Sequence, residues 1–442
     1  MSEECSCVVN GRNYNELSTR DLQVLFSETE DKYNELKNLG LKLDLSRGKP
    51  GPDILAISEG YMDKVTTYKA TDGTDIRNYG VLDGLPELKQ LFSDLLDIPT
   101  DKMIVGGNAS LSYMHFINVI LALYGAVIDS DDGTVTTFSA PWSTSETKIL
   151  FPVPGYDRHA TICEDLGFTL IPVEMLGDGP DMDQVEALVA NDASIKGIWC
   201  VPLYTNPEGK VYSEATAKRL AEMKTAAPDF RIFWDNAYAV HHIYEVHSAP
   251  DILRLCEAAG NKNRPYYFAS TSKVTYPGAG VALFASSDDN IAQYKKHMNA
   301  LTIGHDKFPQ LRTVEYFHDA DGIRSHMWRI AEVLRPKFDI VTCYLDRELG
   351  GTGVLNYTKP LGGYFVSVNV PDGCAKRVVA LAKEAGVVLT GAGATWPYKK
   401  DPKDRNIRIA PSFPTLSDLK TTMDIFCVCV KLAALEQLLI IE

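Results

Sequence analysis

Lys273 stands where a lysine can do covalent chemistry, in the short motif Ser270-x-Ser272-Lys273. The motif follows the apolar run 266–270 and precedes a glycine-rich turn, which is a poor place for a lysine that only serves solubility. Its amine can form a Schiff base with an aldehyde cofactor, and the two serine hydroxyls can donate to a phosphate. Alone, the motif is weak evidence, so the residues elsewhere in the chain decide its interpretation.

Two further motifs each follow an apolar run. Asp235 ends the run 231–235, with Tyr238 three positions later, and Asn206 follows the run 198–202 in an Asn-Pro-x-Gly turn. The residue before a proline prefers extended geometry, which aims the Asn206 amide outward. Each motif alone has a plain structural explanation, since an aspartate can cap a loop and Asn-Pro-x-Gly is a common turn. Their order along the chain, each after a strand-like run, gives them value.

The chain between about 148 and 286 alternates short β-rich runs with helical stretches, which predicts a mostly parallel sheet. In such sheets ligands gather at the carboxyl ends of the strands. The spacing between Asp235 and Lys273 leaves room for one crossover and a return strand, so both should reach the same edge. From about 288 the pattern becomes helical and then β-like, which predicts a second, smaller α+β domain. Amphipathic helices are expected near both termini, at 18–39 and 415–438.

Composition limits the possible partners and the compartment. The 442 residues carry a formal net charge of -14, and this acidic excess argues against a nucleic-acid partner because it repels phosphate. The amino-terminal stretch lacks a secretion signal. The most apolar stretch, 111–128, contains His115 and Asn118, which favours a buried helix over a membrane span. We therefore expect a soluble, cytoplasmic protein with no membrane partner.

The cysteines and histidines give no sign of a metal site. The nine cysteines include no CxxC pair, which fits reduced thiols in a cytosol, and Cys5 and Cys7 are interpreted as thiols of a polar tail. The neighbouring His241 and His242 cannot easily share one face of a helix, so no metal is expected there.

The ordered set of motifs resembles the fold-type I pyridoxal-phosphate aminotransferases. Other segments of the sequence resemble the bacterial type Ic aspartate aminotransferases: 46–50, 78–80, 106–110, 154–158 and 407–411. This likeness extends from about residue 20 to the end. This resemblance implies an α/β fold in which a large domain with a mostly parallel seven-stranded sheet is joined by a smaller α+β domain. The implied bounds are 1–55 for an amino-terminal segment that joins the small domain, 56–300 for the large cofactor-binding domain and 301–442 for the small domain.

The resemblance also implies roles around the cofactor ring. Lys273 would carry pyridoxal 5'-phosphate as a Schiff base and then act as the base that moves the Cα proton. Asp235 would keep the pyridine nitrogen protonated. Tyr238 and Asn206 would bond the ring's phenolic oxygen, and Tyr156 would stack on the ring.

The cofactor phosphate would lie at the start of an apolar helix. The backbone of Asn108, Ala109 and Ser110 would bind it there, joined by Ser270 and Ser272. The alternative is an ordinary helix cap at Ser110.

Two further positions, Tyr79 and Val281, bear on the expected phosphate site. Tyr79 resembles the tyrosine that reaches the phosphate of the neighbouring subunit, which implies a homodimer with active sites at the subunit interface. Many aminotransferases have an arginine eight residues after the Schiff-base lysine, where this chain has Val281. The charge of the phosphate must therefore be balanced by another group.

Three residues are expected to bind the amino-acid substrate together with Asn206. Arg408, in a strand-like run, resembles the arginine that clamps the substrate α-carboxylate, although a surface strand arginine is an even alternative without the family pattern. Gly48 would add a backbone N–H to the same carboxylate. For the second carboxylate of an acidic substrate we expect Arg158, because alternation along an extended loop would return it to the side of Tyr156. Lys307 and Arg47 are the competitors.

The activity implied is transfer of the amino group from aspartate or glutamate to a 2-oxo acid, most simply 2-oxoglutarate, with ping-pong kinetics. An aminotransferase for another amino acid or a pyridoxal-phosphate lyase is the nearest rival, because the same ring supports several reactions. A rival of another class is a non-catalytic, aminotransferase-like ligand sensor. The acidic charge and the short stretch before Arg47, which leaves no room for a DNA-binding domain, argue against the sensor.

Overall fold

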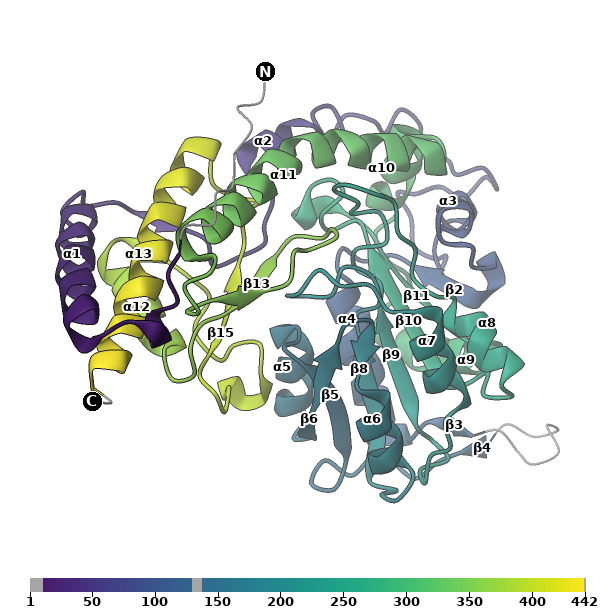
Figure 1. Cartoon of the computed structure of the whole chain (residues 1–442). Coiled ribbons are helices and arrows are strands. Elements are labelled where there is room, and N and C mark those ends of the chain that lie inside the picture. Colours follow the sequence, from purple (N-terminus) through teal and green to yellow (C-terminus); the bar gives the residue numbers. More distant parts are fainter. Residues whose placement is uncertain (1–10, 129–136, 441–442) are drawn as a thin grey trace. The chain divides into compact units, whose positions relative to one another are not determined.

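The computed structural model describes residues 11–128 and 137–440, which form two compact units (Figure 1). The larger unit comprises Ile54–Thr205 and Lys210–Ile330, and the smaller comprises the described residues up to Asp53, Asn206–Gly209 and those from Ala331 onward.

The larger unit is built on an eight-stranded sheet in the order β2-β11-β10-β9-β8-β5-β6-β7. Five central strands, from β10 to β6, are parallel, whereas β11 runs antiparallel to both of its neighbours and β7 runs antiparallel to β6. The predicted mostly parallel sheet is therefore confirmed, with the two-residue β7 as an additional edge strand. The strands are β2 (Met103–Val105), β5 (Lys148–Val153), β6 (Thr169–Leu176), β7 (Gly179–Pro180), β8 (Ile195–Cys200), β9 (Arg231–Asp235), β10 (Pro265–Ser270) and β11 (Ala282–Ala285).

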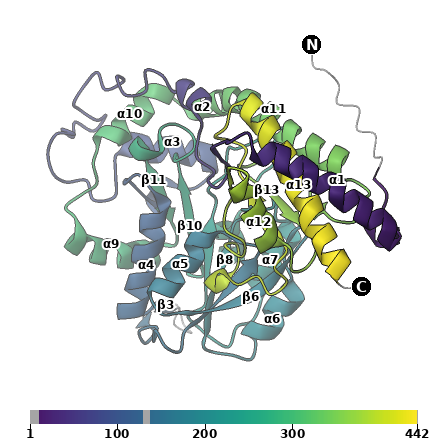
Figure 2. The same ribbon diagram turned by 90° about the vertical axis from the view of Figure 1, so that its left-hand side faces the viewer.

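Central strands of this sheet are apolar on both faces because helices cover both. All five residues of β9 are buried, as parallel strands between two helix layers require. Helices α4 and α5 lie on one side, and α6, α7 and α8 lie on the other (Figures 1 and 2). The helices of this unit include α3 (Pro86–Leu96), α4 (Ser110–Tyr124), α5 (Asp157–Asp165), α6 (Met182–Val189), α7 (Glu214–Glu222), α8 (Ile252–Ala258), α9 (Asp288–Leu301) and α10 (Phe308–Phe317).

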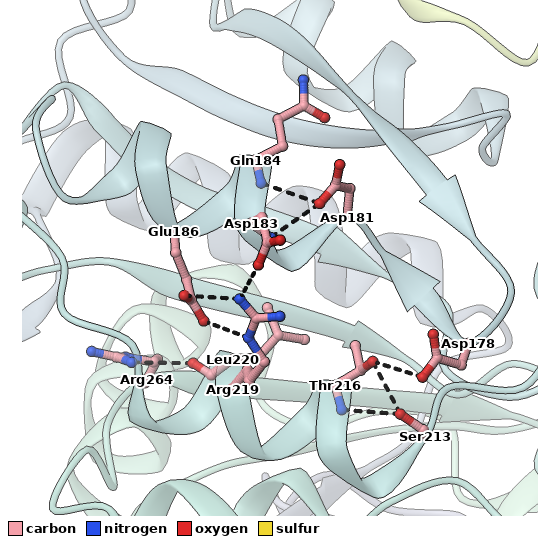
Figure 3. Close-up of polar contacts among 10 residues, drawn as sticks. All are labelled: Asp178, Asp181, Asp183, Gln184, Glu186, Ser213, Thr216, Arg219, Leu220 and Arg264. Atoms are coloured by element: carbon pink, nitrogen blue, oxygen red, sulfur yellow. Dashed lines mark hydrogen bonds and ion pairs between the residues drawn. The ribbon is translucent and has the colours of Figure 1, made fainter.

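Neighbouring helices on one face are joined by side-chain bonds. Arg219 of α7 reaches Asp183 and Glu186 of α6 with N···O distances of 2.6 and 2.8 Å (Figure 3). Ser213 caps the start of α7 by accepting from the Thr216 N–H. The buried helix predicted over 111–128 is α4, which packs on β10 and β11 but ends at Tyr124 before Gly125, so that Val127–Ile128 form a strand instead. None of the helices in the described ranges is long and apolar enough to cross a membrane.

The smaller unit joins both ends of the chain. The predicted terminal helices are present as α1 (Thr19–Lys37) and α13 (Leu416–Ile440), and they pack on each other. Ser18 caps α1, and Thr415 accepts from the Asp418 N–H at the start of α13. The remaining elements are α12 (Ala375–Glu384), the antiparallel strands β12 (Asn356–Tyr357), β13 (Val366–Asn369) and β15 (Asn406–Ile409), and the pair β1 (Leu43–Asp44) and β14 (Val387–Val388).

Short elements and one long helix complete the two units. The 30-residue α11 (Ala320–Leu349) begins in the larger unit and ends in the smaller one. The others are α2 (Pro52–Ala56), the strands β3 (Val127–Ile128) and β4 (Thr137–Phe138), and the 3-10 turns η1 (Tyr14–Glu16), η2 (Thr100–Lys102), η3 (Pro277–Ala279) and η4 (Pro397–Lys399).

The larger unit extends further along the chain than the expected boundary at 300. Residues 301–330 pack within it because α10 is bonded there: the Gln310 side chain accepts from the Leu85 N–H at 2.8 Å, and the Thr313 and Tyr61 hydroxyls lie 2.9 Å apart. The short segment Asn206–Gly209 packs in the smaller unit, where the Gly209 carbonyl accepts from the Leu361 N–H at 3.0 Å.

Most cysteines of the described chain are free and buried: Cys163, Cys200, Cys256, Cys374, Cys427 and Cys429. Cys343 is disulfide-bonded, which departs from the expectation of reduced thiols throughout. The interpretation of Cys5 and Cys7 as tail thiols falls outside the described residues.

Gly84 lies where an added side chain would meet the main chain of β2, so its substitution tests the stability of this contact. It has a φ of +94°, and a Cβ there would lie 2.2 Å from a Val105 methyl and 2.4 Å from the Val105 carbonyl oxygen of β2. Gly60, with a φ of +81° and open space around it, is a matched control. Both alanine variants bear backbone strain, but only Gly84→Ala adds a clash with main chain, so it should lose about 1–3 kcal/mol more than Gly60→Ala. Urea unfolding followed by tryptophan fluorescence checks this, and equal losses would contradict it.

Candidate active site

Neighbouring parallel strands deliver Asp235 and Lys273 to one edge of the sheet. Asp235 is the last residue of β9 and pairs in register with Phe268 of β10, and Lys273 follows the end of β10 by three residues. The Lys273 amine lies 5.2 Å from the centre of the Tyr238 ring. The structure thus brings together three residues singled out from the sequence.

Asp235 forms a buried pair with a histidine and keeps one oxygen free. Its side chain is almost fully buried, and its Oδ2 lies 2.9 Å from Nε2 of the equally buried His159. The other oxygen, Oδ1, is also buried and has no hydrogen-bond partner among the described residues. A buried carboxylate oxygen without a donor is unusual. It fits a ligand that brings an N–H group, as a protonated pyridine does.

Aromatic rings hold His159 in place. It stacks on Trp199 with ring centres 4.1 Å apart and an interplanar angle of 11°, and it meets Tyr156 edge-on at 5.0 Å. Tyr156 immediately precedes α5, and His159 follows it by three positions, so one helix start positions both rings. His159 was not predicted from the sequence. The available signal was this Tyr-x-x-His spacing.

The extended loop expected around Arg158 is not present. Asp157 opens helix α5, so residues 156 to 159 do not form an extended loop with alternating sides. The Arg158 side chain is exposed and makes no ion pair within the described ranges, including the surface pairs considered for it with Asp157 and Glu164.

The start of α4 and the Ser270-x-Ser272 motif form one polar cluster. The Ser270 hydroxyl donates to Ser272 at 2.9 Å, and the Ser272 hydroxyl donates to the Asn108 carbonyl at 3.3 Å. Ala109 is the cap residue and makes no side-chain cap bond, so the alternative of Ser110 as an ordinary cap is wrong. The N–H groups at a helix start, together with two hydroxyls, suit a phosphate.

Val281 contributes no charge to this cluster. It is 1% exposed, its N–H donates to the Thr271 hydroxyl at 2.9 Å, and its carbonyl accepts from the Thr271 N–H at 2.8 Å. Val281 thus stands where many aminotransferases have an arginine, and its backbone bonds to Thr271 only stabilise the turn after Lys273.

Tyr79 is 82% exposed, which is unusual for so large a ring. The next carbonyl, that of Gly80, accepts from the Lys307 amine at 3.1 Å. Lys307 is itself buried. The expected contact of Tyr79 with a neighbouring subunit stays a prediction.

Two neutral histidines follow Tyr238. Burial, with a smaller effect of the Lys273 charge, lowers the pKa of His241 to about 3, and its ring meets Tyr238 edge-on at 5.4 Å. Burial also lowers the pKa of His242 to about 4, and His242 Nδ1 lies 2.6 Å from the Tyr204 hydroxyl. Among the described residues, no group of three His, Cys, Asp or Glu side chains is arranged to hold a metal ion.

Of the substrate residues expected from the sequence, Arg408, Asn206 and Gly48 lie in the smaller unit, whereas Arg158 lies in the larger one. Arg408 of β15 is 7% exposed, donates to the Asn206 side-chain oxygen at 3.2 Å and lies 4.7 Å over the Phe365 ring. A Cβ on Gly48 would come within 2.4 Å of that ring, so glycine is needed for this packing. Phe365 was missed by the sequence analysis. Its ring supports the Arg408 guanidinium.

One strand ends at the buried Asp235, the next is followed by Lys273, and a helix start with serines lies beside the lysine turn. Together with the matches to known proteins, this arrangement places the chain in the fold-type I pyridoxal-phosphate class. The family model described as "Aspartate amino-transferase" matches residues 17–441, and the chain belongs to this family.

Relatives cover nearly the whole chain. An aspartate aminotransferase of Corynebacterium glutamicum is 44% identical over 433 residues, 97% of this chain and 98% of that protein. A Mycolicibacterium smegmatis protein is 48% identical over 433 residues, 97% of this chain and 99% of its own. The crystal structure of an aspartate transaminase from C. glutamicum superposes with a TM-score of 0.91, covering 97% of this chain and 100% of that one at 44% identity. The protein is therefore an aminotransferase.

The buried histidines predict how stability depends on pH. The pKa values of His241 and His242 are lowered in the folded protein to about 3 and about 4, from an ordinary value of 6.5. The unfolded chain therefore binds more protons than the folded protein below pH 6.5, so stability is lost as pH falls. Each histidine should account for about 1.5–2 kcal/mol between pH 7 and pH 5. His242→Gln should flatten that dependence by this amount in urea titrations, and an unchanged slope would contradict the account.

Proposed function

We propose that this aminotransferase carries pyridoxal 5'-phosphate on Lys273, takes aspartate as amino donor and passes the amino group to 2-oxoglutarate. The buried, unbonded Oδ1 of Asp235 carries the cofactor part of the proposal, because it leaves an acceptor for a pyridine N–H. The substrate part is supported by the likeness to C. glutamicum proteins that are named for aspartate, and by the buried Arg408.

The residues of the larger unit act on the substrate Cα and on the ring. When bound, the cofactor supplies an electron-withdrawing ring that stabilises the charge left when the Cα proton departs. Lys273 takes that proton and returns it. Asp235 holds a proton on the pyridine nitrogen, and His159 keeps the carboxylate in place. Tyr156 stacks on the ring, and Tyr238 binds its phenolic oxygen.

The phosphate is bound at the start of α4. The backbone N–H groups of Asn108, Ala109 and Ser110 bind it, and the hydroxyls of Ser270 and Ser272 donate to it. The exposed Tyr79 reaches the phosphate of a second copy, so the active form is a homodimer with active sites at the subunit interface. We place the enzyme in the cytoplasm.

The carboxylates of the substrate are bound by arginines. Arg408 takes the α-carboxylate through two N–H groups, with Asn206 beside it and the Gly48 N–H adding a third donor. Arg158 is our proposal for the second carboxylate, now because it is exposed and makes no ion pair among the described residues. Lys307 is a poorer choice, since it is buried and bonded to the Gly80 carbonyl.

A panel of amino donors tests the proposed specificity, with aspartate, glutamate, alanine and an aromatic amino acid followed in both directions. Arg408→Ala should lower kcat/KM for every donor, because all of them carry an α-carboxylate. Arg158→Ala should lower it about ten- to a hundredfold for aspartate and glutamate only, as expected for one charge-assisted bond. Equal losses for acidic and neutral donors in Arg158→Ala would assign it a structural role. A wild type that prefers a neutral donor would contradict the proposed substrate.

A further inference from the structure

Arg312 of α10 is a buried cation without an anion. It is 7% exposed, and among the described residues it forms no ion pair. Its Nη2 donates to the Ala279 carbonyl at 2.9 Å, and its guanidinium lies 4.8 Å over the Tyr61 ring. Its Nε is buried and has no hydrogen-bond partner in the described part of the chain. Burying a charge in this way is costly unless a counter-charge arrives.

Other buried arginines of the larger unit are satisfied by the protein itself. Arg264 donates to the carbonyls of Leu220, Ala221 and Met223 at the end of α7, where the helix dipole favours a cation. Figure 3 shows the bond to Leu220. Arg312 has one backbone acceptor in place of three. An incoming anion would therefore supply the counter-charge that Arg312 lacks among the described residues.

The carbonyl that Arg312 binds belongs to the loop where the family arginine is missing. Ala279 ends the turn η3, and Val281, two residues on, is bonded to Thr271 between Ser270 and Ser272. At the intervening Gly280, a Cβ would lie 2.6 Å from the Thr271 hydroxyl oxygen. The turn therefore leaves little room for a side chain at Gly280, and the Arg312 guanidinium reaches this loop from α10 through its bond to the Ala279 carbonyl.

Among the described residues, the side chains of the polar cluster beside this loop, at Asn108, Ser110, Ser270 and Ser272, carry no charge. A helix start contributes about half an elementary charge, whereas a phosphate monoester carries about -1.5 to -2 at neutral pH. We propose that Arg312 supplies the missing charge and binds the cofactor phosphate, in place of the arginine that Val281 replaces. This inference rests on the proposed binding of pyridoxal phosphate at Lys273.

The test compares two ligands that differ only in the phosphate, using the cofactor-free form of the whole protein. Dissociation constants for pyridoxal 5'-phosphate and for pyridoxal are measured by absorbance titration. Arg312→Gln should weaken binding of pyridoxal phosphate about ten- to a hundredfold, as loss of a charge-assisted bond predicts. It should leave pyridoxal binding nearly unchanged. Arg264→Gln, which removes a buried arginine bonded only to backbone, should not change the ratio of the two constants.

The outcomes separate this inference from the proposed function. If Arg312→Gln weakens both ligands equally, or keeps the wild-type ratio, the inference is overturned while cofactor binding stands. If wild-type protein binds neither ligand at Lys273, the proposed function itself fails. Should Arg312→Gln not fold, Arg312→Lys carries the test, because an ammonium cannot reproduce the two-pronged guanidinium contact. The preference for pyridoxal phosphate over pyridoxal should then fall several-fold, and an unchanged preference would overturn the inference.

Discussion

The bond between Asp235 and His159 is the interaction on which the active site depends. Both groups are buried, and the histidine occupies one carboxylate oxygen only, so the other is left facing no donor among the described residues. Leaving such an acceptor unbonded costs about 1–3 kcal/mol in a protein without a ligand. The stacking of His159 on Trp199 keeps the Asp235–His159 pair from rearranging, so the second carboxylate oxygen stays unbonded. A cofactor that brings an N–H group removes this cost.

The rest of the larger unit can be understood as the frame for this pair. Strands β9 and β10 are parallel neighbours, so the connection between them returns the chain to the end of the sheet where both strands begin. Both strands therefore end at the same edge and place Asp235 and the turn with Lys273 there. Apolar residues along both faces of those strands fix the register, so the polar residues that follow them have defined positions. Neutral His241, edge-on to Tyr238, adds no charge that would compete with Lys273.

Sequence patterns were sufficient to predict the positions of site residues that follow a strand or begin a helix. Asp235 and Lys273 could be brought together from apolar runs and spacing alone, and Ser110 could be placed at a helix start. His159 could not, because its value lies in a contact with a residue 76 positions away. The start of α5 was missed because Tyr156, in its cap position, makes none of the side-chain bonds that usually mark a helix start, and the error about Arg158 followed from that. The length of the larger unit was underestimated because contacts of Gln310 with a distant loop hold α10 there.

Trapping the cofactor on its lysine tests the central claim most directly. Purified protein is reduced with borohydride, digested and examined by mass spectrometry for a phosphopyridoxyl adduct. The account predicts a yellow protein that bleaches on reduction, with the adduct on Lys273 alone. Lys273→Ala protein should still bind the cofactor through its phosphate and should yield no adduct. Recovery of the adduct on any other lysine, or a wild-type protein that takes up no cofactor, would contradict the account.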